Sequence, residues 1–268
     1  MDIHLSGATR LYMIIGDPIA QVRSPAGMTA AFTARGHDGI LVPVQVGSAD
    51  LGELLDVSDK LKNLGGIVVT VPHKFGCFSA CAEASERAAF IGSVNIMRQR
   101  PEGGWYGDIV DGIGFLGAAM NAGFAPAGKR ALLVGAGGAG SAIALALIDA
   151  GVAELAIHDA DAVRRDALIA RLNTLGKGKA VVGSTDPTGF DLAGNATPMG
   201  MKEGDPLPMD VTKLKPATHV GCVITQPAVS PLIAAARTAG CPTSTGTEMY
   251  FALQEKMVDF LLRADDRG

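Results

Sequence analysis

The sequence has no basic tract, no paired cysteines and no apolar leader. Its 23 lysines and arginines stand against 27 acidic residues and give a net charge of −4, so nucleic acid is not an expected partner. The four cysteines have no spacing typical of a metal site, and no metal is expected. We interpret them as small buried hydrophobic residues in a reducing compartment. They are Cys77, Cys81, Cys222 and Cys241.

Nothing in the sequence indicates a membrane. Asp2, His4 and Arg10 surround an N-terminus without an apolar segment, so no signal peptide is expected. Residues 131–148 are uncharged, but they contain four glycines within ten residues, and a bilayer helix would gain nothing from the turn that these predict. We therefore expect a cytoplasmic protein, either a monomer or a homodimer.

Apolar segments of strand length alternate with helical ones along the chain, which predicts an α/β protein with parallel sheets. Ser24 is the predicted cap of the first helix, with Pro25 in its first turn. Residues 93–99 and 105–106 are expected to form a hairpin. Other predicted strands are 11–15, 40–46, 66–71, 154–158 and 219–224, and predicted helices include 24–34, 49–64, 74–89, 111–122 and 248–263.

Two lobes are expected. Residues 1–107, completed by the C-terminal helix in 243–268, form a substrate-binding and catalytic α/β domain. Residues 108–242 form a Rossmann dinucleotide-binding domain. The active site is expected in the cleft between them, because ligand sites occur preferentially at domain interfaces.

The segment Leu132–Ser141 is an apolar strand that leads into a Gly-x-Gly-x-x-Gly turn, followed by a helix predicted over 141–149. Gly135 permits a tight turn, Gly137 lets the backbone approach phosphates, and Gly140 allows helix and strand to pack closely. Free N–H groups at the start of the helix would face the anion. The predicted pyrophosphate site is therefore Gly135, Ala136, Gly137, Gly138, Ala139 and Gly140.

Asp159 follows the next predicted strand, nineteen residues beyond Gly140. A carboxylate at this place accepts hydrogen bonds from an adenosine ribose and repels a 2′-phosphate, which favours NAD over NADP. Arg164 and Arg165 are close enough in sequence to bind a phosphate, so NADP stays possible. Alternatively, Asp159 is a turn or helix-cap residue, a role that Asp161 also fits.

Seven short blocks follow one another along the chain. They are Gly16–Ala20 with Ser24-Pro25, Val69–Lys74, Ile91–Asn95, Gly107–Gly112, the glycine turn, Asn195–Met201 and Gly246–Gln254. In this order and spacing they resemble the shikimate dehydrogenase family over nearly the whole chain. The resemblance implies an oxidoreductase that transfers hydride reversibly between NAD(P) and a ring hydroxyl or ketone of a small alicyclic acid such as shikimate.

The resemblance implies that Lys74 and Asp111 form the catalytic pair. Hydride leaves carbon only as the hydroxyl loses its proton, so a base must lie within hydrogen-bond reach of that oxygen. We treat the two side chains as one coupled unit that shares the proton. Without the resemblance, they would be read as a surface lysine and a helix-capping aspartate.

The resemblance also assigns binding roles to individual residues. Those expected to bind ring hydroxyls are Thr70, Asn95 and Gln254, and Ser24 is expected to hold the carboxylate. On a structural reading alone, Ser24 caps a helix and Gln254 lines an exposed helix face. Residues expected to contact the dinucleotide beyond the glycine turn are Asp159, Arg164, Thr197 and Met199.

Apolar residues replace several expected polar ones in the substrate pocket. Val22 stands where the family has a first carboxylate-binding serine, Ile109-Val110 where it has Asn-Thr, Val68 where it has Asn, and Thr225 where it has Tyr. An unpaired ligand group costs about 1–3 kcal/mol, so shikimate should bind more weakly than to a standard member. Alternatives are a quinate or other alicyclic hydroxy-acid dehydrogenase, a non-catalytic NAD-binding regulator, and a folate-linked dehydrogenase.

Overall fold

The computed structural model describes residues 5–263, so Asp2 and His4 lie outside the described residues. The chain divides into two compact units. The first runs up to Val110 and resumes at Gln254, and the second spans Asp111–Leu253. Residues 108–110, expected with the second domain, therefore group with the first unit, and residues 243–253, expected with the first domain, group with the second.

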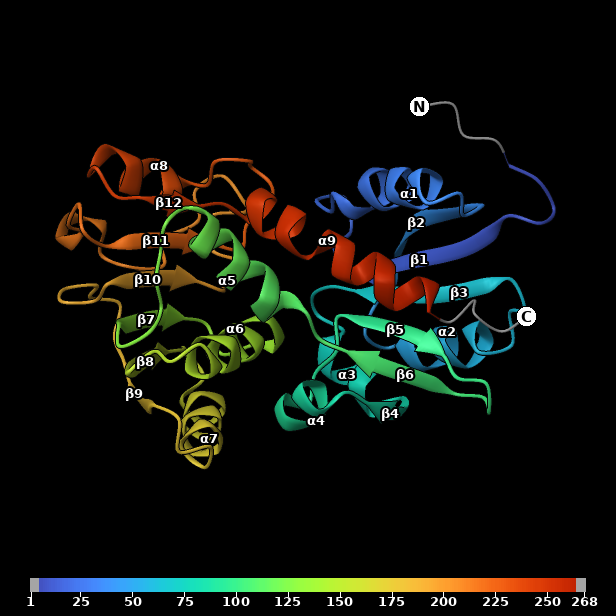
Figure 1. Cartoon of the computed structure of the whole chain (residues 1–268), viewed down its shortest axis with the longest axis horizontal. Coiled ribbons are helices and arrows are strands. Elements are labelled where there is room, and N and C mark those ends of the chain that lie inside the picture. Colours follow the sequence, from blue (N-terminus) through green and yellow to red (C-terminus); the bar gives the residue numbers. More distant parts are fainter. Residues whose placement is uncertain (1–4, 264–268) are drawn as a thin grey trace. The chain divides into compact units, whose positions relative to one another are not determined.

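The first unit is built on a mixed sheet with strand order β2-β1-β3-β5-β6-β4 (Figure 1). Strands β2, β1 and β3 are parallel, whereas β5 is antiparallel to both β3 and β6. The central strand β3 is buried along its whole length, as expected for a strand covered on both faces. The elements are β1 (Arg10–Gly16), α1 (Ser24–Ala34), β2 (Gly39–Gln45), α2 (Leu51–Ser58), β3 (Leu64–Val69), α3 (Lys74–Ser79), β4 (Cys81–Ala84), α4 (Glu86–Ile91), β5 (Ile96–Gln99) and β6 (Trp105–Asp108).

The single helix predicted over 74–89 is wrong. Helix α3 ends at Ser79, strand β4 follows, and α4 begins at Glu86. The side chain of Ser85 caps α4 by accepting a hydrogen bond from the amide of Ala88. Strand β4 forms because it pairs with β6, more than twenty residues later in the chain. The local pattern of apolar residues does not reveal this pairing. Cys81 therefore does not share a helix with Cys77.

Two further helix predictions need correction in the first unit. The helix expected over 49–64 is shorter, because α2 ends at Ser58 and Leu64 already begins β3. Ser24 does not cap α1: the cap position is Arg23, and no side chain makes a capping hydrogen bond there. The cap interpretation of Ser24 is thus removed.

The second unit is built on a wholly parallel sheet with strand order β12-β11-β10-β7-β8-β9. This is the doubly wound strand order. Successive strands are added on one side of β7 up to β9 and on its other side from β10 onward, and such sheets bind nucleotides at the point between β7 and β10 where the order reverses. The elements are α5 (Asp111–Asn121), β7 (Arg130–Val134), α6 (Gly138–Asp149), β8 (Glu154–His158), α7 (Ala162–Asn173), β9 (Lys179–Val182), β10 (Leu192–Asn195), the 3-10 helix η1 (Val211–Lys213), β11 (His219–Cys222), α8 (Pro231–Thr238), β12 (Thr243–Ser244) and α9 (Gly246–Leu262), whose second half belongs to the first unit.

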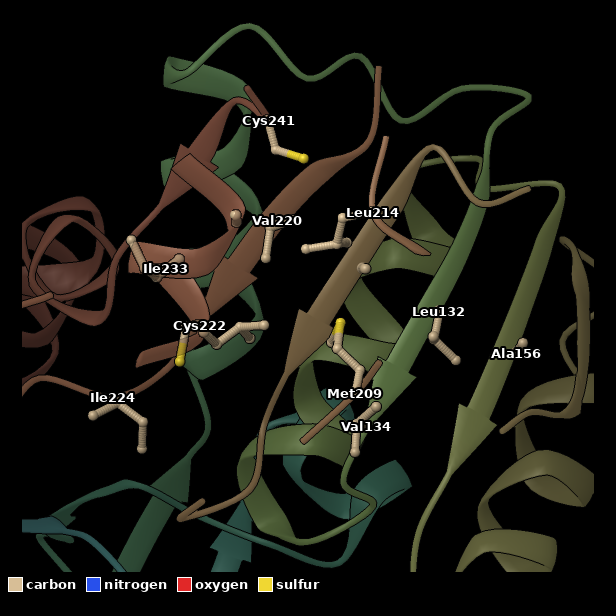
Figure 2. Packing of buried hydrophobic residues seen from close by; sticks show 13 residues of the cluster. Leu132, Val134, Ala156, Met209, Leu214, Val220, Cys222, Ile224, Ile233 and Cys241 are labelled. Atoms are coloured by element: carbon tan, nitrogen blue, oxygen red, sulfur yellow. The ribbon is translucent and has the colours of Figure 1, made fainter. Parts of the chain in front are cut away.

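Apolar side chains fill the space beside this parallel sheet. Figure 2 shows Leu132 and Val134 on β7, Val220 on β11 and Ile233 on α8 within one buried cluster. Helices α5 and α6 pack closely at Gly112, where a Cβ would lie 2.2 Å from the carbonyl oxygen of Ala142. Among residues 5–263, no helix has the length and apolar character needed to span a bilayer.

Candidate active site

The glycine turn of the second unit follows β7 and depends on two glycines for different reasons. Gly135 has φ +110°, a left-handed conformation that side chains disfavour, and a Cβ there would meet the backbone of Ala196 at 2.9 Å. A Cβ on Gly140 would lie 2.0 Å from the carbonyl oxygen of Gly135. The turn can therefore form only with glycine at both places.

Helix α6 begins at Gly138, three residues earlier than predicted, with Gly137 as its cap. The amide of Ser141 is not free, because it donates to the carbonyl of Gly137 at 2.8 Å. The amides of Gly138, Ala139 and Gly140 lie in the first turn of the helix, where the helix offers no carbonyl acceptor four residues earlier. A methyl group on Gly137 would meet nothing within 4 Å, so packing within the unit does not require glycine there.

Asp159 is buried at the end of β8, and its carboxylate is tied to the turn. It accepts hydrogen bonds from the amides of Ala136 (2.6 Å) and Asp161 (2.8 Å) and from the guanidinium of Arg164 (2.7 Å). Burial alone would raise the pKa of Asp159, but these three hydrogen bonds and the Arg164 charge lower it overall. The amide of Ala136 is therefore already used within the protein, and Arg164 neutralises the carboxylate.

The loop after β10 lies against the glycine turn, and Asn195 organises it. This fully buried side chain accepts from the amide (3.0 Å) and hydroxyl (2.7 Å) of Thr197 and donates to the carbonyl of Met199 (3.2 Å). The amide of Ala196 donates to Val134 on β7 at 2.7 Å. Thr197 is thus held beside the turn, where its methyl group would lie 3.0 Å from a Cβ on Gly135, and Met199 is tied to the same loop by its amide, which donates to the Thr197 hydroxyl at 3.2 Å. Asn195 received no role from the sequence, although a polar residue ending an otherwise apolar strand was a usable signal.

In the first unit, several predicted residues meet at the carboxyl edge of the parallel strands. Thr70 directly follows β3, and its amide donates to Ile15 on β1 at 2.9 Å. A Cβ on Gly16 would lie 2.4 Å from the Thr70 methyl group, so glycine there makes room for this side chain. Lys74 is the first residue of α3, and its carbonyl accepts from the amide of Val94 at 3.0 Å.

Asn95 lies at the same edge because β5 runs antiparallel to β3. Its carbonyl accepts from the amide of Val69 at 2.7 Å, and its side-chain oxygen accepts from the amide of Val110 at 3.0 Å. The side-chain amide of Gln254 donates to the carbonyl of Gly27 on α1 at 2.8 Å. Gln254 therefore does not merely line an exposed face. The residue that it contacts, Gly27, is one helical turn beyond Ser24, which is 9% exposed.

Asp111 is the first residue of α5 and of the second unit, and it is buried. The residue three places earlier, Asp108, is also buried and accepts hydrogen bonds from Arg87, Ser85 and the amide of Ile109. Asp108 received no role from the sequence. Its side-chain partners Ser85 and Arg87 are more than twenty residues earlier in the chain, so no local pattern reveals them.

The apolar replacements are largely core residues. Val68, Ile109 and Val110 are 4%, 1% and 1% exposed. Burial of apolar side chains at these positions leaves no unpaired polar group. Within the part of the chain that the structure describes, no cluster of three or more histidine, cysteine, aspartate or glutamate side chains could hold a metal.

Comparison with known proteins gives consistent matches. Residues 14–97 match the model of the shikimate dehydrogenase substrate binding domain. The shikimate dehydrogenase (NADP(+)) of Rubrobacter xylanophilus is 36% identical over 253 residues, which cover 91% of this chain and 88% of the relative.

Two solved structures are similar over almost the whole chain. Shikimate 5-dehydrogenase from Listeria monocytogenes, in complex with shikimate and NAD, is 26% identical with a TM-score of 0.85, covering 99% of this chain and 97% of the other. The ligand-free 5-ketofructose reductase of a Gluconobacter strain is 30% identical with a TM-score of 0.81, covering 95% and 93%.

Proposed function

Because the chain belongs to the shikimate dehydrogenase family, we propose that it is an oxidoreductase that interconverts shikimate and 3-dehydroshikimate with a nicotinamide dinucleotide. One observation carries the proposal. The chain matches a shikimate dehydrogenase over 91% of its length, and it has Lys74 and Asp111, the residues of the proposed catalytic pair, as the first residues of α3 and α5. A chain that only sensed a dinucleotide would have no use for this pair.

The proposed chemistry needs one proton transfer beside one hydride transfer. A dinucleotide held at residues 135–140 would supply the hydride acceptor or donor. Lys74 and Asp111, acting as a coupled pair, take the proton from the ring hydroxyl during oxidation and return it during reduction. The groups proposed to hold the ring are Thr70, Asn95 and Gln254 for its hydroxyls and Ser24 for its carboxylate.

Lys74→Ala tests the proposal. We expect kcat to fall by about a thousandfold, because acid–base catalysis contributes on the order of 10²–10⁴, while calorimetric binding of the dinucleotide is unchanged. Lys60→Ala, an exposed lysine of the same unit, is the matched control and should leave kcat unaltered. Turnover of Lys74→Ala near the wild-type rate would reject the mechanism. Absence of turnover in the wild type with every ring acid would favour a regulator.

We propose that the dinucleotide binds at residues 135–140, with Asp159, Arg164, Thr197 and Met199 around its adenosine and pyrophosphate. Asp159 on its own favours NAD, but the guanidinium of Arg164 cancels its charge and is 44% exposed. The curated relative bears NADP(+) in its name, and Arg164 offers a 2′-phosphate a charged partner. NADP is therefore proposed as the better cofactor, with NAD also accepted.

Initial rates with both dinucleotides test this assignment. Arg164→Ala should lower kcat/KM for NADP at least tenfold, since a charge-assisted hydrogen bond contributes about 1.5–3 kcal/mol, and change it little for NAD. Arg165→Ala is the matched control, because Arg165 pairs with Asp166 instead. A wild type that prefers NAD tenfold would overturn the choice of NADP.

A second candidate substrate is favoured by Val22, which is partly exposed and stands where the family has a carboxylate-binding serine. The loss of this serine leaves one group fewer for a substrate carboxylate, so a hydroxyketone without a carboxylate would fit better, whereas quinate has the carboxylate and one more hydroxyl than shikimate. The 30% identical neighbour is a 5-ketofructose reductase. A panel of shikimate, quinate and 5-ketofructose, ranked by kcat/KM, decides among them.

We also propose that the protein works in the cytoplasm as a monomer or homodimer. All four cysteines are free, and burial raises the pKa of both Cys77 and Cys81 to about 12. Such thiols are unreactive hydrophobic groups, which suits a reducing compartment.

A further inference from the structure

The two residues that join β6 to α5 have both backbone amides bound by buried side chains. The amide of Ile109 donates to the Asp108 carboxylate at 2.7 Å, and the amide of Val110 donates to the Asn95 side chain at 3.0 Å. The side chains of Ile109 and Val110 are themselves buried. The backbone immediately before Asp111 is therefore held by two hydrogen bonds to side chains of the first unit.

Arg87 holds the first of these two anchors. Its guanidinium donates through Nε to one oxygen of Asp108 at 2.8 Å and through Nη2 to the other. A two-pronged pair of this kind fixes the orientation of the carboxylate as well as its position. Asp108 is 6% exposed, so water competes little for its oxygens.

Ser85 adds a third donor and connects Asp108 to α4. Its hydroxyl donates to Asp108 and also accepts from the amide of Ala88, while its own amide donates to the carbonyl of Gly107 at 2.9 Å. The amide of Asn95 donates to the carbonyl of Asp108 at 2.9 Å. The two anchors thus form one network, which contains a residue proposed to bind the substrate and ends one residue before the proposed catalytic aspartate.

We propose that Asp108 and Arg87 are positioning residues for the reaction, acting through the backbone that carries Asp111 and through Asn95. The inference rests on the proposed function. Ordinary fold stability would not require a buried carboxylate at this point, because an ion pair whose arginine side chain is 40% exposed adds little net stability. Placing a catalytic group accurately does require a fixed anchor such as the Asp108 carboxylate, because a displacement of about 1 Å can lower the rate a hundredfold.

Arg87→Gln tests the proposal. Arg87→Lys is a second variant, which keeps the positive charge but cannot donate to both oxygens of Asp108 as the guanidinium does. We expect kcat per folded molecule to fall roughly ten- to a hundredfold in Arg87→Gln, with KM for the dinucleotide unchanged, and Arg87→Lys to recover only part of the rate. Hydrogen exchange at the amides of Ile109 and Val110 should become faster in both variants, independent of any activity.

Arg100→Gln is the matched control. Arg100 directly follows β5 and forms an ion pair with Glu83 on β4, so its loss should change neither kcat nor exchange at the two amides. If Arg87→Gln keeps the wild-type kcat while Lys74→Ala is inactive, the positioning role is rejected and the proposed function stands. If Lys74→Ala is also fully active, the proposed function fails with it. A lower melting temperature with unchanged kcat would mean a purely structural role.

Discussion

The two units provide ligand-facing groups in different ways. In the second unit the candidate site is backbone: a glycine turn, the first amides of α6, and a loop whose shape Asn195 sets. In the first unit it consists of side chains at a strand edge, among them Thr70 and Asn95, held by hydrogen bonds from neighbouring strands. A phosphate chain can be bound by unspecific backbone amides, whereas the hydroxyls of a ring need individually placed side chains.

The difference has a consequence for mutation. A backbone site fails when any atom is added where the chain approaches itself, because neither partner can rotate away. A side-chain site can adapt, since rotamers shift at modest cost. Substitutions that add one carbon should therefore differ more in their effects between the two units than substitutions that remove a functional group.

Gly140→Ala should have the largest effect. Its new Cβ would lie 2.0 Å from the carbonyl oxygen of Gly135, and we expect the free energy of unfolding to drop by about 3 kcal/mol, at the upper end for overpacking, with loss of dinucleotide binding. Urea unfolding and calorimetric titration measure both.

Gly137→Ala is the control for this experiment, because a Cβ there meets nothing within 4 Å. Its free energy of unfolding should match that of the wild type. Any loss of dinucleotide affinity would then result from contact between the added methyl group and the ligand. Equal destabilisation by the two substitutions would contradict the account of the turn.

Residues 130–159 were readable from the sequence because their determinants are local. The strand, the glycine spacing, the helix and the following strand are consecutive, and the parallel pairing of β7 with β8 follows from their connection by a helix. Two boundaries differ: β7 begins at Arg130, two residues before the predicted strand, and α6 begins at Gly138, because Gly138 and Ala139 give no strong signal for either turn or helix. The partners of Asp159 were not readable, because the amide of Ala136 reaches it only after the turn has formed.

Residues 74–91 were not readable for the opposite reason. Strand β4 is stabilised by pairing with β6, and the two small residues Ala80 and Ala82 fit a helix pattern as well as a strand. The cap at Ser85 was a local signal for the start of a new helix, and it was overlooked. For the site, chemistry-bearing residues were found through the family resemblance, whereas Asp108, Arg87 and Asn195 act through contacts that only the folded chain creates.

Protonation of His219 should have the next largest effect, on the second unit's sheet. His219 begins β11, is 2% exposed, and its Nε2 lies 3.0 Å from the hydroxyl of Ser244. Burial lowers its pKa to about 4, with Glu248 opposing the shift. Because the unfolded chain, with an ordinary pKa near 6.5, binds more protons than the folded one between these values, stability is complete above about pH 6.5 and decreases as pH falls toward 4.

The loss attributable to His219 should approach about 3 kcal/mol at pH 4. Urea unfolding of the wild type and of His219→Asn at pH 7 and pH 4.5 measures it: the gap between the two proteins should shrink at the lower pH. A gap that stays constant would mean that His219 does not titrate on unfolding.

Gly16→Ala is expected to have the smallest effect and tests the side-chain site directly. The added Cβ would lie 2.4 Å from the Thr70 methyl group and 3.0 Å from the carbonyl of Val71. Because Thr70 can rotate, we expect a stability loss of only about 1 kcal/mol, at the lower end for overpacking. The rotation moves the Thr70 hydroxyl, so KM for the ring substrate should rise while KM for the dinucleotide stays constant. Gly52→Ala, which meets nothing within 4 Å in the same unit, should change neither constant. A destabilisation as large as that of Gly140→Ala would show that the carboxyl edge of the first unit's parallel strands is as rigid as the glycine turn. The proposed difference between an adaptable side-chain site and a rigid backbone site would then be wrong.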